Sequence, residues 1–352
     1  MISWTADAAR LPAGGDSIRT MENPSAVLRG IRDVVIEDRP VPVPGHGQVL
    51  VAVKATGICG SDIHYYEQGR IGDFVLEAPM VIGHESAGLI NAVGSGVDPS
   101  RVGEQVALEP GVPCRRCLQC RSGRYNLCPD VVFFATPPVD GSISRYVVID
   151  ADFAHRAPEE ISLEQAALAE PVSVGVWAAR KASITAGDRV LVAGAGPIGL
   201  LAAQVARAQG ADGVTVTDVN EYRLSVASAM GLEAVRAGEE PPGDFTVLLE
   251  CSGAGAALDH GLRALAPAGR AVLVGMGADE VSVSVPLIQG RELTISGVFR
   301  YANTYPTALG LIASGAVDVE AVITHRFALE ETESALTLAA REPDSLKAVV
   351  LN

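Results

Sequence analysis

Four cysteines stand close together in the chain: Cys114, Cys117, Cys120 and Cys128. Thiolates at this spacing can share one tetrahedral zinc ion, and four sulfur ligands complete its coordination sphere. A complete sphere leaves no position for a substrate, so we predict a structural zinc site. Iron–sulfur clusters use related cysteine spacing, but no second run of this kind accompanies the first, which favours zinc.

A second group of candidate metal ligands is spread more widely: Cys59, His84, Glu85 and Glu170. One cysteine, one histidine and one or two carboxylates suit a catalytic zinc ion with an open position. Each residue also has a structural interpretation: Cys59 as a small buried residue, His84 as a core histidine and Glu170 as an acid at a helix start. Their occurrence beside a structural zinc motif and a nucleotide motif favours the catalytic site.

The nucleotide motif is a GxGxxG run that follows the apolar segment Arg189–Ala193 and opens a predicted helix. In this context glycines allow a tight turn, a close approach to a pyrophosphate and close packing of helix on strand. The residues predicted to contact the dinucleotide here are Gly194, Gly196, Pro197, Ile198 and Gly199. Asp218 follows about twenty residues later, where an acid binds ribose hydroxyls and repels a 2′-phosphate. We therefore predict NAD rather than NADP, with helix capping as the alternative role of Asp218.

The predicted secondary structure that positions these residues changes after Glu170. Before it, short apolar runs separated by proline and glycine predict an all-β, barrel-like unit. After it, predicted strands at Val190–Val192, Val214–Thr217, Val247–Glu250 and Ala271–Val274 alternate with helices at Pro197–Gln209, Glu221–Met230 and Ala256–Leu265. This alternation predicts a parallel sheet. Further helices are predicted at Tyr305–Ser314 and Glu330–Arg341, and edge strands at Val281–Val285 and Leu293–Val298.

Composition narrows the function classes. The chain has 352 residues, enough for two or three domains, and its 42 acidic and 27 basic residues give a net charge of −15. That charge argues against binding to nucleic acids or to anionic membranes. The first twenty residues carry charges and lack the apolar core of a signal peptide. With no targeting or membrane signal, we expect a cytoplasmic location.

Several runs together carry a family resemblance: GICGSDIHYYEQGRIGDF, PMVIGHE, EPGVPCRRCLQCRSGRYNLC, FFATPPVDG, AEPVSVGVWAAR, GAGPIG and GVFRYANTYP. They span residues 34–352. The chain resembles the zinc-dependent medium-chain dehydrogenase/reductase family, and within it the polyol branch of sorbitol (L-iditol) and xylitol dehydrogenases. The resemblance implies a GroES-like β-barrel domain of residues 1–172 and 303–352, with 1–22 as a flexible leader. It also implies a Rossmann domain of residues 173–302.

The same resemblance implies roles at the metal. Cys59, His84 and Glu85 would hold the catalytic zinc, and Glu170 would approach it directly or through a water molecule. Alcohol dehydrogenases of the superfamily have a cysteine where this chain has Glu170, so simple alcohols are less expected. The residues implied around the metal ligands are Ser61 and His64 as a proton relay and Asp62 as the partner of His84.

The predicted substrate-binding residues are Tyr65, Phe134, Thr136, Arg300 and Tyr301. Further predicted cofactor-binding residues are Arg223, Val274, Val298 and Arg300. The predicted activity is NAD-dependent oxidation of a polyol to a ketose with two zinc ions per chain. Alternatives are a butanediol or threonine type of secondary-alcohol dehydrogenase, or a non-catalytic sensor that binds NAD and zinc. A homo-oligomer, either a dimer or a tetramer, is expected to form near the edge strands.

Overall fold

The computed structural model describes residues 21–239 and 244–352. The flexible leader expected at residues 1–22 therefore lies almost wholly outside the described residues. Within them, no helix combines the length and the apolar character needed to cross a membrane.

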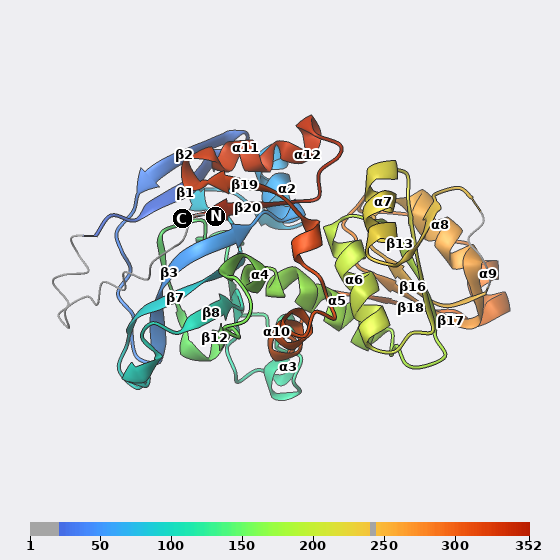
Figure 1. Cartoon of the computed structure of the whole chain (residues 1–352), viewed down its shortest axis with the longest axis horizontal. Coiled ribbons are helices and arrows are strands. Elements are labelled where there is room, and N and C mark those ends of the chain that lie inside the picture. The colour runs from blue at the N-terminus through green and yellow to red at the C-terminus, as the bar shows by residue number, and fades with distance from the viewer. Residues whose placement is uncertain (1–20, 240–243) are drawn as a thin grey trace.

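A seven-stranded, mostly antiparallel sheet forms the centre of the strand-rich half (Figure 1, left). Its strands are β3 (Gln48–Gly57), β7 (Glu85–Val93), β8 (Gln105–Leu108), β11 (Tyr146–Asp150), β12 (Ala154–Arg156), β19 (Ile323–Ala328) and β20 (Lys347–Leu351). The C-terminal strand β20 pairs antiparallel with β3, with Leu351 opposite Ala55. The end of the chain thus completes a sheet that its first third begins, which sequence patterns alone could not establish.

Smaller strands surround this sheet. A three-stranded sheet is formed by β2 (Asp33–Asp38), β1 (Pro24–Gly30) and β6 (Met80–Val81). Two short pairs join β4 (Arg70–Ile71) to β5 (Phe74–Val75), and β9 (Gly111–Val112) to β10 (Val132–Phe133). The helical segments of this half are α2 (Gly60–Gln68), α3 (Leu118–Arg121), α4 (Leu163–Ala167) and α5 (Ala169–Lys181), with single turns at Pro99–Arg101, Tyr125–Leu127 and Ala151–Phe153.

The other half is a six-stranded parallel sheet in the order β15-β14-β13-β16-β17-β18 (Figure 1, right). Its strands are β13 (Arg189–Ala193), β14 (Gly213–Asp218), β15 (Glu233–Arg236), β16 (Phe245–Glu250), β17 (Leu265–Leu273) and β18 (Thr294–Gly297). Its helices are α6 (Pro197–Ala208), α7 (Glu221–Ala229), α8 (Gly255–Ala264) and α9 (Val285–Arg291). The predicted alternation of strands and helices is confirmed, and the fold is a GroES-like β domain joined to a Rossmann domain.

The two halves share one hydrophobic core. It runs from Val192 and Leu200 of the parallel sheet and its first helix to Val176 of α5 and Tyr305 of α10 (Tyr305–Ala313), and all four side chains are buried. Because α5 and α10 pack together and α5 also packs on α6, the helices between the two sheets are held rigidly. Glu170, in the first turn of α5, therefore lies at a fixed place between the halves.

Two sequence predictions of local structure are wrong. Val281–Val285 alternates like a strand, but residues 281–284 are irregular and α9 begins at Val285. The hydroxyl of Ser284 accepts the backbone N–H of Leu287, and Pro286 lies in the first turn, both of which favour a helix start. The single helix predicted at Glu330–Arg341 is instead a turn at Leu329–Glu331 followed by α11 (Thr332–Leu336) and α12 (Leu338–Arg341).

Candidate active site

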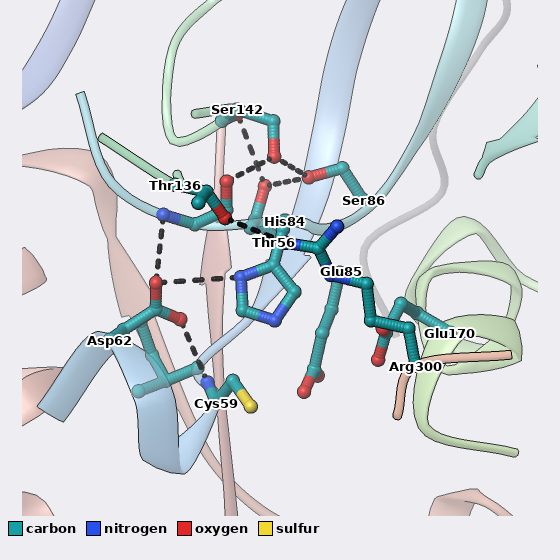
Figure 2. Close-up of polar contacts among 12 residues, drawn as sticks. Thr56, Cys59, Asp62, His84, Glu85, Ser86, Thr136, Ser142, Glu170 and Arg300 are labelled. Carbon is teal, nitrogen blue, oxygen red and sulfur yellow. Dashed lines mark hydrogen bonds and ion pairs between the residues drawn. The ribbon is translucent and has the colours of Figure 1, made fainter. Parts of the chain in front are cut away.

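Three potential metal ligands converge at the edge of the strand-rich half. Cys59 precedes α2, and His84 and Glu85 stand at the start of β7. The Cys59 sulfur, a His84 ring nitrogen and a Glu85 oxygen all lie within 4.8 Å of one another, and Figure 2 shows the three side chains pointing toward a common space. A soft sulfur, an imidazole and a carboxylate with one side open form a donor set that fits catalytic zinc.

Asp62 fixes the orientation of this group. Its Oδ2 accepts the backbone N–H of Cys59 at 3.0 Å, which also caps the start of α2. Its Oδ1 accepts the backbone N–H of Gly83 at 3.0 Å and lies 3.6 Å from Nδ1 of His84 (Figure 2). Burial works against the charge of Asp62, but His84 and the two N–H groups outweigh it and lower the pKa of this carboxyl. An ionised Asp62 favours a proton on Nδ1 of His84 and leaves Nε2 free for a metal.

Glu85 has a partner that sequence reasoning missed. The Lys347 ammonium donates to both carboxylate oxygens of Glu85, at 2.8 and 2.9 Å, and to the carbonyl of Ile58 at 2.9 Å. Both side chains are buried. Burial disfavours the charged ammonium, but Glu85 outweighs this and raises the pKa of Lys347. The only signal available in the sequence was the lysine itself, 262 residues away, so nothing local connected the two.

A Cβ atom at Gly57 would collide with the carboxylate of Glu85. Only glycine at this position on β3 therefore leaves room for Glu85 to turn toward Cys59 and Lys347. The close approach explains why a glycine stands in the strand just before the metal ligands.

Glu170 lies beside the ligand group and not within it. Its side chain is buried, and Oε1 accepts a hydrogen bond of 2.7 Å from the hydroxyl of Tyr301. Burial raises the pKa of Glu170 to about 7, against the lowering effect of His84 and with a further increase from Glu85. Glu170 is thus a carboxyl group that changes charge near neutral pH and can exchange a proton there.

The predicted relay residues are placed differently. Ser61 lines the cavity in front of the metal ligands. His64, three residues further along α2, is half-buried and does not line that cavity. No hydrogen bond joins Ser61 to His64 within the described ranges. A relay between them therefore needs a bridging group such as a cofactor hydroxyl or water.

One cavity of about 260 Å³ connects the metal ligands to the parallel-sheet half. Four of the five predicted substrate residues line it: Tyr65, Phe134, Thr136 and Arg300. Tyr301 does not, because its hydroxyl is held behind the cavity by Glu170. Sequence reasoning missed the apolar lining residues Ile71, Phe74, Phe133, Val174, Met276 and Phe299.

Arg300 adopts a left-handed backbone conformation, with φ of 53°. Its guanidinium lies 3.8 Å from the ring centre of Phe133 and 4.9 Å from that of Phe299. Nη2 also donates to the hydroxyl of Thr136 at 3.4 Å (Figure 2). Stacking between two rings fixes this planar cation at the cavity wall with most of its donors free.

The nucleotide motif takes the predicted form, a tight turn from β13 into α6. A Cβ atom on Gly199 would collide with the carbonyl oxygen of Gly194. The carboxylate of Asp218, at the end of β14, accepts the backbone N–H groups of Ala195 at 2.7 Å and Asn220 at 2.9 Å. These bonds hold Asp218 against the glycine turn, where its remaining lone pairs can accept ribose hydroxyls.

The other predicted cofactor residues lie at two places. Ile198, Val274 and Val298 line the cavity shared with the metal ligands. Arg223 lies on α7, and its buried Nε has no partner among the described residues. Such a donor fits an acceptor group on a bound ligand, because an unpaired buried N–H is costly.

Residues 114–128 form a segment that we call the cysteine lobe, and its four cysteines also lie close together. The four sulfur atoms lie within 4.8 Å of one another. Backbone N–H groups of Arg116 and Cys117 lower the pKa of Cys114 to about 7, while burial raises the pKa of Cys120 and Cys128, so Cys114 is the most readily ionised of these three thiols. All six cysteines are free thiols, so the four sulfurs are available as the ligands of a structural zinc ion.

Comparisons with known proteins agree with this arrangement. Residues 45–159 match the family described as alcohol dehydrogenase GroES-like domain, and residues 197–314 match zinc-binding dehydrogenase. Sorbitol dehydrogenase of Bacillus subtilis is 43% identical over 340 residues, covering 93% of this chain and 96% of the relative.

Two of the matching solved structures show that the fold is shared over most of this chain. An Escherichia coli alcohol dehydrogenase in complex with NADH superposes with a TM-score of 0.87 at 31% identity, covering 94% of this chain and 99% of that one. The 2R,3R-butanediol dehydrogenase of Bacillus subtilis does so with a TM-score of 0.85 at 28% identity, covering 94% and 99%.

Proposed function

Because this chain belongs to the zinc-dependent medium-chain dehydrogenase/reductase family and to its polyol dehydrogenase branch, we propose that it oxidises a sorbitol- or xylitol-like polyol to a ketose. The chain is an oxidoreductase whose cofactors are NAD and zinc. One observation carries the proposal: Cys59, Glu170 and Arg300 line the same cavity as Ile198 and Val274 of the nucleotide-binding half. Metal ligands, a titrating acid and a multi-donor cation thus face the place where a nicotinamide would lie.

Cys59, His84 and Glu85 would hold the catalytic zinc, with Glu170 reaching it directly or through a water molecule. Zinc at such a site supplies Lewis-acid activation of a hydroxyl group, and NAD supplies the hydride acceptor. Ser61 would take the hydroxyl proton, and His64 would pass it outward through a bridging group. The apolar walls of the cavity would exclude water from the reacting carbon.

The polyol's other hydroxyl groups need fixed partners, since burying them unpaired is costly. Tyr65, Thr136 and Arg300 are the polar groups on the cavity wall that we propose as these partners. Phe134 would cover the carbon chain. Tyr301 would act indirectly, by holding Glu170.

The substitution Arg300→Ala tests this assignment. We expect it to raise KM for sorbitol or xylitol about tenfold or more and to change KM for 2-propanol little, because only the polyol loses hydrogen bonds. Equal effects on both substrates would assign Arg300 to the cofactor instead.

A second candidate is oxidation of a smaller secondary alcohol, such as 2,3-butanediol or threonine. The observation in its favour is the number of apolar side chains around the cavity, including Phe74, Phe133 and Met276. A polyol still fits better, because a small diol has only one hydroxyl group beyond the reacting one, whereas Tyr65, Thr136 and Arg300 together offer several partners on the cavity wall. A non-catalytic sensor is disfavoured, since Ser61 and the complete ligand set serve no purpose in binding alone.

We also propose the wider organisation of the protein. Residues 1–172 and 303–352 would form the catalytic domain and residues 173–302 the NAD domain, as the pairing of β20 with β3 supports. Exposed Val281, Val283 and Val285, which precede the edge strand β18 in the chain, support a homodimer or homotetramer. Six free thiols support a reducing, cytoplasmic location.

A further inference from the structure

The irregular segment Val298–Thr304 joins β18 to α10 and forms part of the cavity wall. It carries Arg300 at the cavity and Tyr301 against Glu170. Two non-glycine residues of the segment, Arg300 and Asn303, have φ values of 53° and 57°. Asparagine tolerates this left-handed conformation, but it is unfavourable for Arg300, so surrounding contacts must stabilise it there.

Those contacts come largely from the cysteine lobe. The Asn303 backbone N–H donates to the Tyr125 hydroxyl at 2.7 Å, and Asn126 Nδ2 donates to the Phe299 carbonyl at 2.8 Å. A third bond of 3.0 Å runs from Asn303 Nδ2 to the carbonyl of Gly123. The three lobe residues lie between Cys120 and Cys128.

Tyr125 and Asn126, which form two of these bonds, are themselves held in place. The Tyr125 hydroxyl donates to Oε1 of Glu109 at 2.5 Å, and Glu109 is 2% exposed. Burial raises the pKa of Tyr125, as does Glu109, so the phenol keeps the proton that it donates. Asn126 is 5% exposed, so its bond to Phe299 is shielded from water.

The segment is also held from α5. Arg180 Nη1 donates to the carbonyl of Asn303 at 2.8 Å. Asn303 is therefore held between the helix that carries Glu170 and the lobe that carries the four cysteines. The backbone at both ends of the Arg300–Tyr301 pair has a partner outside the segment.

We propose that Tyr125 and Asn126 are positioning residues for the polyol site, through which the cysteine lobe sets where Arg300 and Tyr301 lie. The proposal rests on the proposed function for its choice of substrate. It gives the lobe a role in substrate recognition beyond the stability that a structural zinc contributes. Neither residue touches the cavity near the metal ligands, so their effect passes through the backbone of residues 299–303.

The test uses Tyr125→Phe, which keeps the ring and removes the hydroxyl, and Asn126→Ala, alone and combined. We expect each single variant to raise KM for sorbitol or xylitol about fivefold, and KM for 2-propanol less than about twofold. The matched control is Ser122→Ala, whose exposed hydroxyl donates to the carbonyl of Gln119 and accepts from Nε of Arg124, both within the lobe. It should change neither value.

A second readout does not depend on turnover. Amide hydrogen exchange at residues 299–303 should become faster in Tyr125→Phe and stay unchanged in Ser122→Ala, while exchange in the strands of the parallel sheet stays unchanged. If the wild type oxidises no polyol, the proposed function fails. Amide hydrogen exchange at residues 299–303 still tests whether Tyr125 positions this segment. Unchanged exchange in Tyr125→Phe, or an equal loss of kcat on both alcohols without a change in KM, would overturn this proposal.

Discussion

The hydroxyl of Tyr301 donates a 2.7 Å hydrogen bond to Oε1 of Glu170, and both side chains are buried. The two residues lie 131 positions apart and belong to α5 and to the segment after β18. A hydrogen bond of this kind favours the ionised carboxylate. Burial acts in the opposite direction and dominates, so the pKa of Glu170 rises to about 7.

This balance predicts the pH dependence of catalysis. If ionised Glu170 is the active form, kcat should rise as the pH increases through about 7. Tyr301→Phe removes a bond that favours the ionised form, so the midpoint of the kcat profile should move upward by about one pH unit. The control is Tyr66→Phe, whose hydroxyl bonds to Glu333 instead.

Glu170→Gln should lower kcat strongly at every pH and change Tm little, because a neutral amide can still accept from Tyr301. If Glu170→Gln keeps activity within a few-fold of the wild type, Glu170 has no catalytic role and is only an acid at the start of a helix. If the pH profile of kcat in Tyr301→Phe has the same midpoint as in the wild type, the hydrogen bond from Tyr301 does not affect the pKa that controls kcat.

Cofactor choice is expected to depend on Asp218. Asp218→Ala removes the carboxylate held by the N–H groups of Ala195 and Asn220. We expect weaker NAD binding and a lower ratio of kcat/KM for NAD to that for NADP, since a ribose contact and a repulsion are both lost. Asp259→Ala, at an exposed acid paired with Arg263 on α8, is the control. The assignment fails if the ratio in Asp218→Ala equals that of wild type.

Substitution of a cysteine by serine should have different effects at the two proposed zinc sites. Cys114→Ser should lower Tm and reduce the zinc content by about one ion per chain, because structural zinc contributes folding free energy. Cys59→Ser should abolish turnover and leave the fold and NAD affinity close to wild type. Cys251→Ser, at the thiol outside both groups, should change neither zinc nor activity. A fully active wild type with only one zinc ion per chain would contradict the assignment of two zinc sites.

Lys347 is expected to matter for stability. In the zinc-free protein, Lys347→Met leaves the buried carboxylate of Glu85 without a cation, which costs about 3–5 kcal/mol when one partner of a buried pair is removed. Urea unfolding measures this loss. The double variant Lys347→Met/Glu85→Gln should recover part of it, because the uncompensated charge is gone. A Lys347→Met protein as stable as wild type would mean that the charge of Glu85 needs no partner.

The parts of the site that sequence could predict are those encoded locally. The cysteine spacing of the lobe and the glycine turn before α6 each lie within one short stretch of the chain and imply their own geometry. The ligands around Cys59 are spread more widely, and their residue types and the family resemblance predicted them. The bonds of Lys347 to Glu85, Tyr301 to Glu170 and Asn126 to Phe299 join residues 262, 131 and 173 positions apart. Only the closing of β20 onto β3 and the path of the segment after β18 bring these pairs together.

The most direct test of the central claim is the rate of NADH formation by the zinc-loaded wild type with sorbitol, xylitol, 2,3-butanediol, threonine and 2-propanol. We expect kcat/KM to be highest for a polyol, by about tenfold or more over any substrate with fewer hydroxyl groups, since only a polyol has enough hydroxyl groups to pair with Tyr65, Thr136 and Arg300 together. A wild type that prefers 2,3-butanediol or threonine would contradict the assignment of the cavity to a polyol, and no NADH with any substrate would contradict catalysis itself.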